Sequence, residues 1–230
     1  MNSHLMANLK TPAKPLKMPV QARSTQTVEA IFQATVQVLV STGMHKLTTT
    51  KVAERAGVSV GTLYQYFPNK NVLLAAALER HLNAVVSAVE TACNAAKGQT
   101  IKTMAAAMVG AFVDAKLRHP DASKALYAVA SELGSAEVVA RMTQRSQLAL
   151  CDVLATATDA KFRDLKIVSY MLSTALVGPV QGLLQADMPP AFIEAVKQQL
   201  TLMTSAYLHE CGDGGVVKKQ GQSAAKKTLQ

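Results

Sequence analysis

Apolar residues in this 230-residue chain recur at helical spacing along most of its length, and that pattern constrains the fold more than any other feature. In residues 25–41, for example, Val28, Ile31, Thr35, Val38 and Leu39 share one face of a helix. The strict alternation that would indicate half-buried strands is almost absent. Aromatic residues make up 4% of the chain and Trp is missing, which also favours helices over sheets. The sequence therefore predicts an all-α protein.

Glycine, proline and capping residues divide the chain into about nine predicted helices. Three helices come first, of which the second and third are short, and a long fourth helix follows the turn formed by Pro68 and Asn69. Pro179 lies inside the eighth helix and predicts a kink or a break there. The expected ranges are 25–41, 49–56, 60–67, 70–97, 100–118, 121–132, 135–157, 163–186 and 190–210.

Positive charge is confined to three parts of the chain. Residues 1–22, residues 23–70 and the tail 212–230 each carry a net charge of +3, whereas residues 71–211 are neutral. Proline, glycine and lysine in the two ends predict a disordered basic arm (1–22) and a disordered basic tail (212–230). The remainder is predicted to form a domain over 23–70 and a larger one over 71–211. A basic segment favours a polyanionic partner, although basic tails can also serve only solubility.

Several classes of protein are disfavoured by what the chain contains. Cys93, Cys151 and Cys211 are odd in number and show no zinc-site spacing, so we expect reduced thiols and no metal site. The five histidines are scattered, and no catalytic triad pattern or phosphate-binding glycine loop occurs, which predicts a protein that is not an enzyme and needs no cofactor. No signal peptide and no 18-residue apolar run is evident, so a soluble cytoplasmic protein without membrane contact is expected.

The segment from Leu47 to Lys70 carries the strongest functional signal. Its pattern predicts two short helices, capped by Thr48 and Ser59 and joined by a tight turn at Gly57. Apolar residues four apart anchor the second helix in the core. The residues left wholly or partly outward form a face without charge, which suits a DNA groove better than solvent. They are Val60, Gly61, Thr62, Tyr64, Gln65 and Tyr66.

The run Thr-x-x-x-Val-Ala-x-x-Ala-Gly-Val-Ser-x-Gly-Thr-Leu-Tyr-x-Tyr-Phe-x-x-Lys, which ends at Lys70, resembles the signature of the TetR family of transcriptional regulators. The resemblance extends over roughly residues 28–74. It implies a three-helix, N-terminal helix-turn-helix DNA-binding domain and a larger helical domain for ligand binding and dimerisation. The implied base-facing residues are Val60, Gly61, Tyr64 and Gln65, and the implied phosphate contacts come from Thr48, Thr49, Thr50, Thr62, Tyr66 and Lys70.

Three of these positions also allow a simpler interpretation. Val60 is apolar where relatives often carry Lys, so it either contacts a thymine methyl group or packs against its own turn. Tyr64 could be partly buried beside Leu63, and Lys70 could be a solvated lysine.

Two further sites are predicted in the larger domain. Small and apolar residues on the last two helices predict a dimer interface, which the resemblance implies is a four-helix bundle, although these stripes could also pack within one chain. The candidates are Met171, Ala175, Gly178, Gly182, Phe192, Val196, Leu200 and Met203. The resemblance also implies a small-molecule site among the middle helices, where few charges predict a mainly apolar effector. The candidates, which equally suit an ordinary core, are Met104, Met108, Phe112, Leu126, Tyr127, Met142 and Leu148.

The expected function is therefore that of a ligand-responsive regulator, with repression the commoner outcome among relatives. It would bind a palindromic double-stranded DNA operator as a homodimer and be released by a small effector. The alternative is a DNA-binding regulator or architectural protein with no small-molecule inducer.

Overall fold

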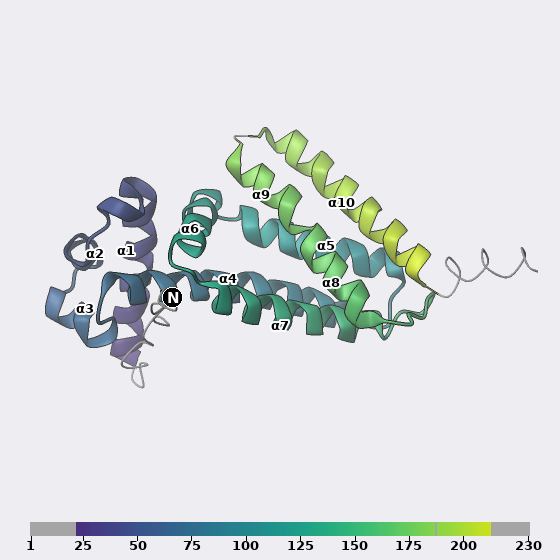
Figure 1. Ribbon diagram of the computed structural model, residues 1–230, viewed down its shortest axis with the longest axis horizontal. Helices are drawn as coiled ribbons and strands as arrows, with labels where there is room; N and C mark the ends of the chain where they lie inside the picture. Colours follow the sequence, from purple (N-terminus) through teal and green to yellow (C-terminus); the bar gives the residue numbers. More distant parts are fainter. Residues whose placement is uncertain (1–21, 187, 213–230) are drawn as a thin grey trace, which may run out of the picture. The chain divides into compact units, whose positions relative to one another are not determined.

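The computed structural model describes residues 22–186 and 188–212, and in these ranges the chain is helical, with a single isolated bridge between Phe162 and Gly212 in place of any strand (Figure 1). The all-α prediction is confirmed. The predicted arm and tail lie outside the described residues, apart from residues 22 and 212. The helices are α1 (Ala22–Lys46), α2 (Thr49–Ala56), α3 (Val60–Tyr66), α4 (Lys70–Ala95), α5 (Ile101–Leu117), α6 (Pro120–Glu132), α7 (Ala136–Leu154), α8 (Leu165–Ala175), α9 (Val177–Gln185) and α10 (Pro190–Cys211).

The predicted eighth helix is two helices, so the described residues contain ten helices rather than about nine. Pro179 explains the break, as predicted. A proline ring clashes with the helical carbonyl four residues earlier, which here belongs to Ala175, and α8 ends at that residue. Pro179 then lies in the first turn of α9, where a missing N–H removes no helical hydrogen bond.

The helices form two compact units. Among the described residues, the first unit comprises 22–80 with 125–135, and the second comprises 81–124 with 136–212. The predicted domain boundary after residue 70 differs from this division, because the first eleven residues of α4, about three turns, belong to the first unit. Leu73, Leu74 and Leu78 are buried in that part of α4, and Arg80 forms an ion pair with Glu29 of α1.

The first unit is held together by a small apolar core. Ile31 of α1, Val52 of α2 and Leu63 of α3 are fully buried. Phe67, which follows α3, packs the edge of its ring against Phe32 of α1, with the ring centroids 5.4 Å apart. Helices α1, α2 and α3 are therefore fixed to one another by side chains that the helical periodicity places on their inner faces.

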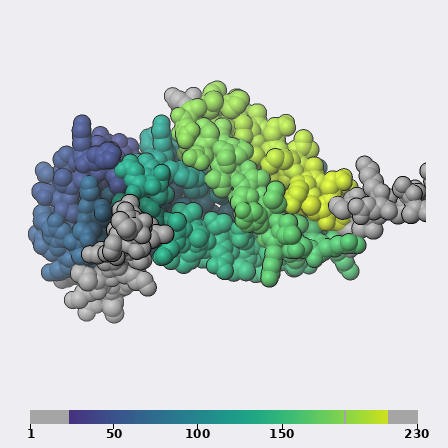
Figure 2. Space-filling view, viewed as in Figure 1, coloured from purple at the N-terminus to yellow at the C-terminus, as the bar shows by residue number. Residues whose placement is uncertain are grey.

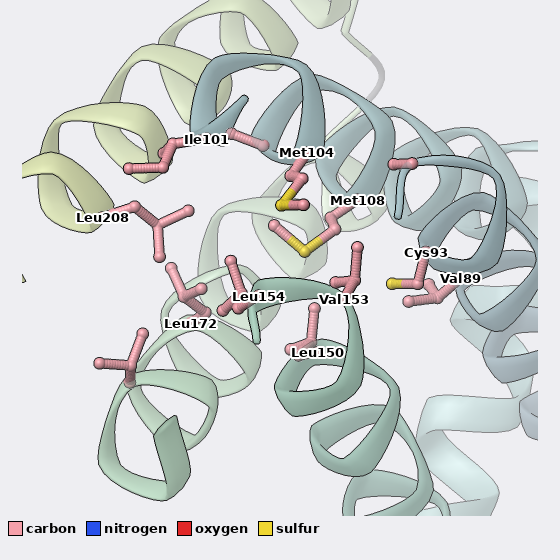
Figure 3. Packing of buried hydrophobic residues seen from close by; sticks show 13 residues of the cluster. Val89, Cys93, Ile101, Met104, Met108, Leu150, Val153, Leu154, Leu172 and Leu208 are labelled. Atoms are coloured by element: carbon pink, nitrogen blue, oxygen red, sulfur yellow. The ribbon is translucent and has the colours of Figure 1, made fainter. Parts of the chain in front are cut away.

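The second unit contains a larger core between α5, α7, α8 and α10. Figure 3 shows Met104 and Met108 of α5 pointing toward Val153 and Leu154 of α7, and all four are buried. A second cluster joins α5 to α9 and α10 through Val109, Val113, Leu176, Val180 and Leu200. The three cysteines carry free thiols, as expected.

Two helical stretches, Lys70–Ala95 and Leu165–Gln185, are long and apolar enough to cross a membrane by length and composition alone. The sequence prediction concerned an uninterrupted apolar run, and polar residues interrupt both stretches, so this finding does not contradict it. In the apolar 18-residue segment of each stretch, 44% of the residues in the first and 39% in the second are buried inside the protein. Core helices of soluble proteins pass the same test, so the finding is weak evidence for a membrane span.

Candidate nucleic-acid interface

Helix α2 is capped at both ends, and α3 at its N-terminal end, by the residues predicted to cap them. The Thr48 hydroxyl accepts a hydrogen bond from the Lys51 N–H at 3.2 Å, and the Ser59 hydroxyl accepts one from the Thr62 N–H at 3.0 Å. Gly57 adopts the left-handed conformation (φ 68°) at the end of α2, which a residue with a Cβ adopts only with strain. The predicted helix-turn-helix geometry is confirmed at the level of its caps and turn.

The outward surface of α3 is uncharged, as its sequence requires. Gly61, Tyr64 and Gln65 are exposed, with 43% of Tyr64 accessible, and Val60, Thr62 and Tyr66 are half-buried. The prediction that these six residues point wholly or partly outward agrees with the structure, because only Leu63 of α3 is buried among its seven residues.

The hydroxyl groups on this surface are already oriented by internal hydrogen bonds. The Tyr64 Oη and Thr49 Oγ1 atoms lie 3.0 Å apart, which joins α3 to α2, and the Thr62 and Ser59 hydroxyls lie 2.8 Å apart. A hydroxyl that takes part in one hydrogen bond keeps a further lone pair or its proton for another. Thr49 and Tyr64 therefore form a linked pair across the two helices, which the sequence did not predict. Thr50 is exposed and lies next to this pair.

Three described cations on α2 and at the start of α4, namely Lys51, Arg55 and Lys70, each donate a hydrogen bond to a group of α1. The Lys70 Nζ donates to the carbonyl of Met44 at 3.4 Å, so Lys70 is half-buried rather than simply solvated. Lys51 and Arg55 are exposed on α2 and were not among the predicted site residues. The sequence pattern could have identified these two residues. Both lie on the side of α2 opposite the buried Val52 and Ala53, as polar residues on an amphipathic helix do.

The predicted effector residues are divided between the two units. Met104 and Met108 are buried in the main cluster, and Phe112 packs against both clusters of the second unit. Met142 is also buried in this unit, whereas Leu126 and Tyr127 belong to the first.

The structure corrects the prediction that Leu148 is an effector residue. Its surface is 58% exposed, so it cannot line an internal pocket of one chain. It lies two residues before the buried Leu150, which places the two on opposite sides of α7.

The candidate dimer interface lies on the helices that carry most of the exposed large hydrophobic side chains of the described residues. Seven of the eleven exposed large hydrophobic side chains of the described residues lie on α8, α9 and α10, and we call them the α8–α10 face. Figure 2 shows these helices as a continuous light-green to yellow surface. The α8–α10 face consists of Ile167, Tyr170, Met171, Val177, Phe192, Leu202 and Met203.

Three of the eight predicted interface residues belong to this face, and four more are exposed or half-buried on the same helices. Met171, Phe192 and Met203 belong to it; Ala175, Gly178 and Gly182 are exposed on the same helices, and Val196 is half-buried. The structure corrects the prediction that Leu200 lies in the interface, because Leu200 is buried against Val109 and Val113 of α5.

Tyr170 and Leu202 belong to the α8–α10 face but were missed as interface candidates. Each adjoins a predicted residue, so the pairs Tyr170–Met171 and Leu202–Met203 could have indicated a wider stripe.

The chain matches two models of protein families. One, for bacterial regulatory proteins of the tetR family, matches residues 31–77, which contain α2 and α3. The other, for the tetracyclin repressor-like C-terminal domain, matches residues 100–208, from the start of α5 to near the end of α10. The two matches together take in more than half of the chain.

Proteins of known name and structure agree with these matches. The HTH-type transcriptional repressor KstR of Mycobacterium tuberculosis is 33% identical over 137 residues, which are 55% of this chain and 61% of KstR. KstR of Mycolicibacterium smegmatis is 34% identical over 117 residues, 49% of this chain and 56% of that protein, so the match spans less than two thirds of either relative. A TetR family transcription regulator from Marinobacter aquaeolei superimposes with a TM-score of 0.61 at 20% identity, over 80% of this chain and 96% of that one, which shows a shared fold.

Proposed function

This chain belongs to the TetR family of bacterial regulatory proteins, and on that premise we propose that it is a transcriptional repressor controlled by a small molecule. The family and the named relatives are regulators rather than enzymes. The proposed repressor binds a palindromic DNA operator in the cytoplasm as a homodimer, and a mainly apolar effector releases it. Repression is favoured over activation because the KstR relatives are named repressors.

The observation that carries the proposal is the exposed, uncharged surface of α3. An exposed helix face with Gly61, Tyr64 and Gln65 and no ionised group is poorly suited to bulk solvent, yet it offers both hydrogen-bonding and apolar contacts to base edges. Thr49, Thr50, Lys51 and the other cations around it would contact phosphates, which position the helix in the groove.

The homodimer is supported by the α8–α10 face. Apolar side chains this numerous on adjoining helices would leave a large hydrophobic patch in water, which monomeric soluble proteins rarely expose. A second copy of the chain that presents the same face would cover both patches at once, as a two-fold interface does. Two copies also supply two reading helices, which a palindromic operator requires.

The effector part of the proposal rests on the methionines of α5. Met104 and Met108 lie in the middle of the main cluster, and methionine adapts its shape more readily than branched side chains. An apolar molecule could take up space there by displacing these flexible side chains.

A selection experiment tests the proposal as a whole. The full chain is incubated with a pool of random duplexes, and the bound fraction is sequenced after several rounds. We expect a palindrome with half-sites about 34 Å apart, or a multiple of that distance, bound by two chains as measured by light scattering. Tyr64→Ala should abolish the enrichment, whereas Val40→Ala, with 43% of its side chain exposed on α1 like that of Tyr64, should not. Equal binding to all duplexes would contradict an operator-specific regulator and support an architectural protein.

A ligand screen on the same complex tests the effector. We expect apolar compounds that raise the melting temperature of the free protein to release the selected duplex. If stabilising compounds leave the duplex bound, the effector part of the proposal is wrong while the DNA-binding part stands.

A further inference from the structure

Helix α3 lacks the side chains that most often read guanine. In the major groove guanine presents two acceptors, O6 and N7, which Arg and Lys bind most commonly. No residue of α3 is charged. The side chains of α3 therefore limit which base pairs this helix can select.

The cations of α2, and Lys70 at the start of α4, do not replace those missing from α3. Lys51 and Lys70 each donate to a backbone carbonyl, and the Arg55 Nε donates to the Gln37 amide oxygen at 2.7 Å. All three lie on other helices and are directed by these contacts toward the first unit itself. Cations placed beside a reading helix suit phosphates, whose contacts set position but carry no sequence information.

The side chains that α3 does present match an A·T pair. The Gln65 amide has a donor and an acceptor side by side, which complements the N7 and N6 atoms of adenine. Unlike the hydroxyls of Thr62 and Tyr64, it forms no hydrogen bond with any described residue. Val60 lies in the first turn of α3 and is only partly buried, so methyl surface is left for the C5-methyl group of thymine.

We propose that α3 selects A·T pairs in each half-site, with Gln65 bound to adenine and Val60 in contact with a thymine methyl group. The inference rests on the proposed operator-binding function and adds the class of base that the operator presents to α3. It assigns Val60 a base contact rather than packing against its own turn.

Single-atom changes in the bases test both contacts. The experiment uses the full chain and the duplex that the selection enriches, with 7-deazaadenine (no N7 acceptor) or uracil (no 5-methyl group) placed at one pair per half-site in turn. We expect one 7-deazaadenine position to weaken binding about tenfold for the unaltered chain and not at all for Gln65→Ala. One uracil position should weaken binding about fourfold for the unaltered chain and not at all for Val60→Ala.

The test includes a matched control variant and two kinds of outcome, one that would contradict this inference and one that would contradict the proposed function. Gln144→Ala removes an exposed glutamine on α7 and should respond to both base analogues as the unaltered chain does. Melting followed by circular dichroism verifies that each variant is folded. Half-sites with G·C pairs at the contacted positions, or A·T positions at which neither analogue has an effect, would overturn the inference and leave operator binding intact. A chain that enriches no duplex would overturn the proposed function itself.

Discussion

At the scale of single residues, the candidate interface depends on side chains that are small or already oriented. Gly61 lies in the first turn of α3 in a helical conformation, and a Cβ atom added there would meet only the Ser59 hydroxyl, at an ordinary 3.7 Å. The fold therefore does not need glycine at this position, and glycine weakens a helix relative to alanine. The space that the missing Cβ leaves is on the exposed side, where a partner could approach the backbone closely.

Gly61→Ala separates folding from binding. We expect the free energy of unfolding to stay the same or rise by up to about 1 kcal/mol, because alanine favours the helix. Affinity for the selected duplex should fall at least about tenfold, since the added methyl group meets the groove. Urea unfolding and fluorescence anisotropy measure the two quantities. A variant that binds as tightly as the unaltered chain would show that no groove surface approaches residue 61.

The hydrogen bond between Thr49 and Tyr64 gives a second prediction at this scale. Thr49→Val and Tyr64→Phe each remove one hydroxyl of the pair while keeping the shape of the side chain. If the bond orients Tyr64 for DNA, each change should weaken duplex binding about two- to tenfold, and the double variant should be little worse than either single variant. Fully additive losses in the anisotropy titrations would instead indicate that the two hydroxyls contact DNA separately.

At the scale of elements, helices α4, α5 and α6 bring a buried polar cluster together in the second unit. The Ser123 Oγ donates to the carbonyl of Lys116 at 2.7 Å and lies 3.2 Å from the Nε2 of His81. Because a carbonyl only accepts, the hydroxyl proton is committed to it, so the His81 Nε2 carries a proton and donates to Ser123. Burial lowers the pKa of His81 to about 4, and the charges of Lys116 and His119 contribute to this. Burial also lowers the pKa of Lys116 to about 8.

This cluster makes stability depend on pH. Unfolded His81 has a pKa near 6.5 and folded His81 one of about 4, so between these values the unfolded chain binds more protons and the free energy of unfolding rises with pH. We expect His81→Gln to reduce that slope by up to about 1.4 kcal/mol per pH unit. Urea unfolding from pH 4 to 7 measures it, with the exposed His209→Gln as the control that should keep the slope. Identical slopes for both variants would show that His81 titrates normally in the folded protein.

At the scale of the whole molecule, the α8–α10 face is where two chains are proposed to meet. Met203→Glu places a charge on this face without disturbing the core, because 44% of the side chain is exposed. We expect this variant to be monomeric by light scattering and to bind the palindrome far more weakly, since burying an unpaired carboxylate in an interface is costly.

Val40→Glu is the matched control for the dimer prediction. Its side chain is 43% exposed on α1, outside the α8–α10 face, and the variant should retain the oligomeric state of the unaltered chain. A Met203→Glu protein that stays dimeric would move the proposed interface to another surface. Leu200→Glu is unsuitable for this test, because Leu200 is buried within one chain and a charge there would destabilise the fold itself.

The features that the sequence determined by itself are those that depend on neighbouring residues. Thr48 and Ser59 cap helices by binding N–H groups three residues later, and Gly57 ends α2 by its own backbone conformation. Pro179 breaks a helix through the carbonyl four residues earlier. Such interactions span at most one helical turn, so the pattern of residue types suffices to predict them. The helical character and the uncharged surface of α3 were predictable for the same reason.

Which apolar and polar side chains are buried could not be predicted from the sequence, because burial depends on tertiary packing. Leu200 and Met203 lie on one stripe of α10, yet Leu200 packs on α5 while Met203 is exposed. The pairing of Thr49 with Tyr64 and of Lys70 with the Met44 carbonyl likewise joins separate helices. These outcomes depend on how helices distant in sequence rotate and pack against one another. Helical periodicity predicts which side of a helix is apolar, but not which residues at the edge of that side are buried.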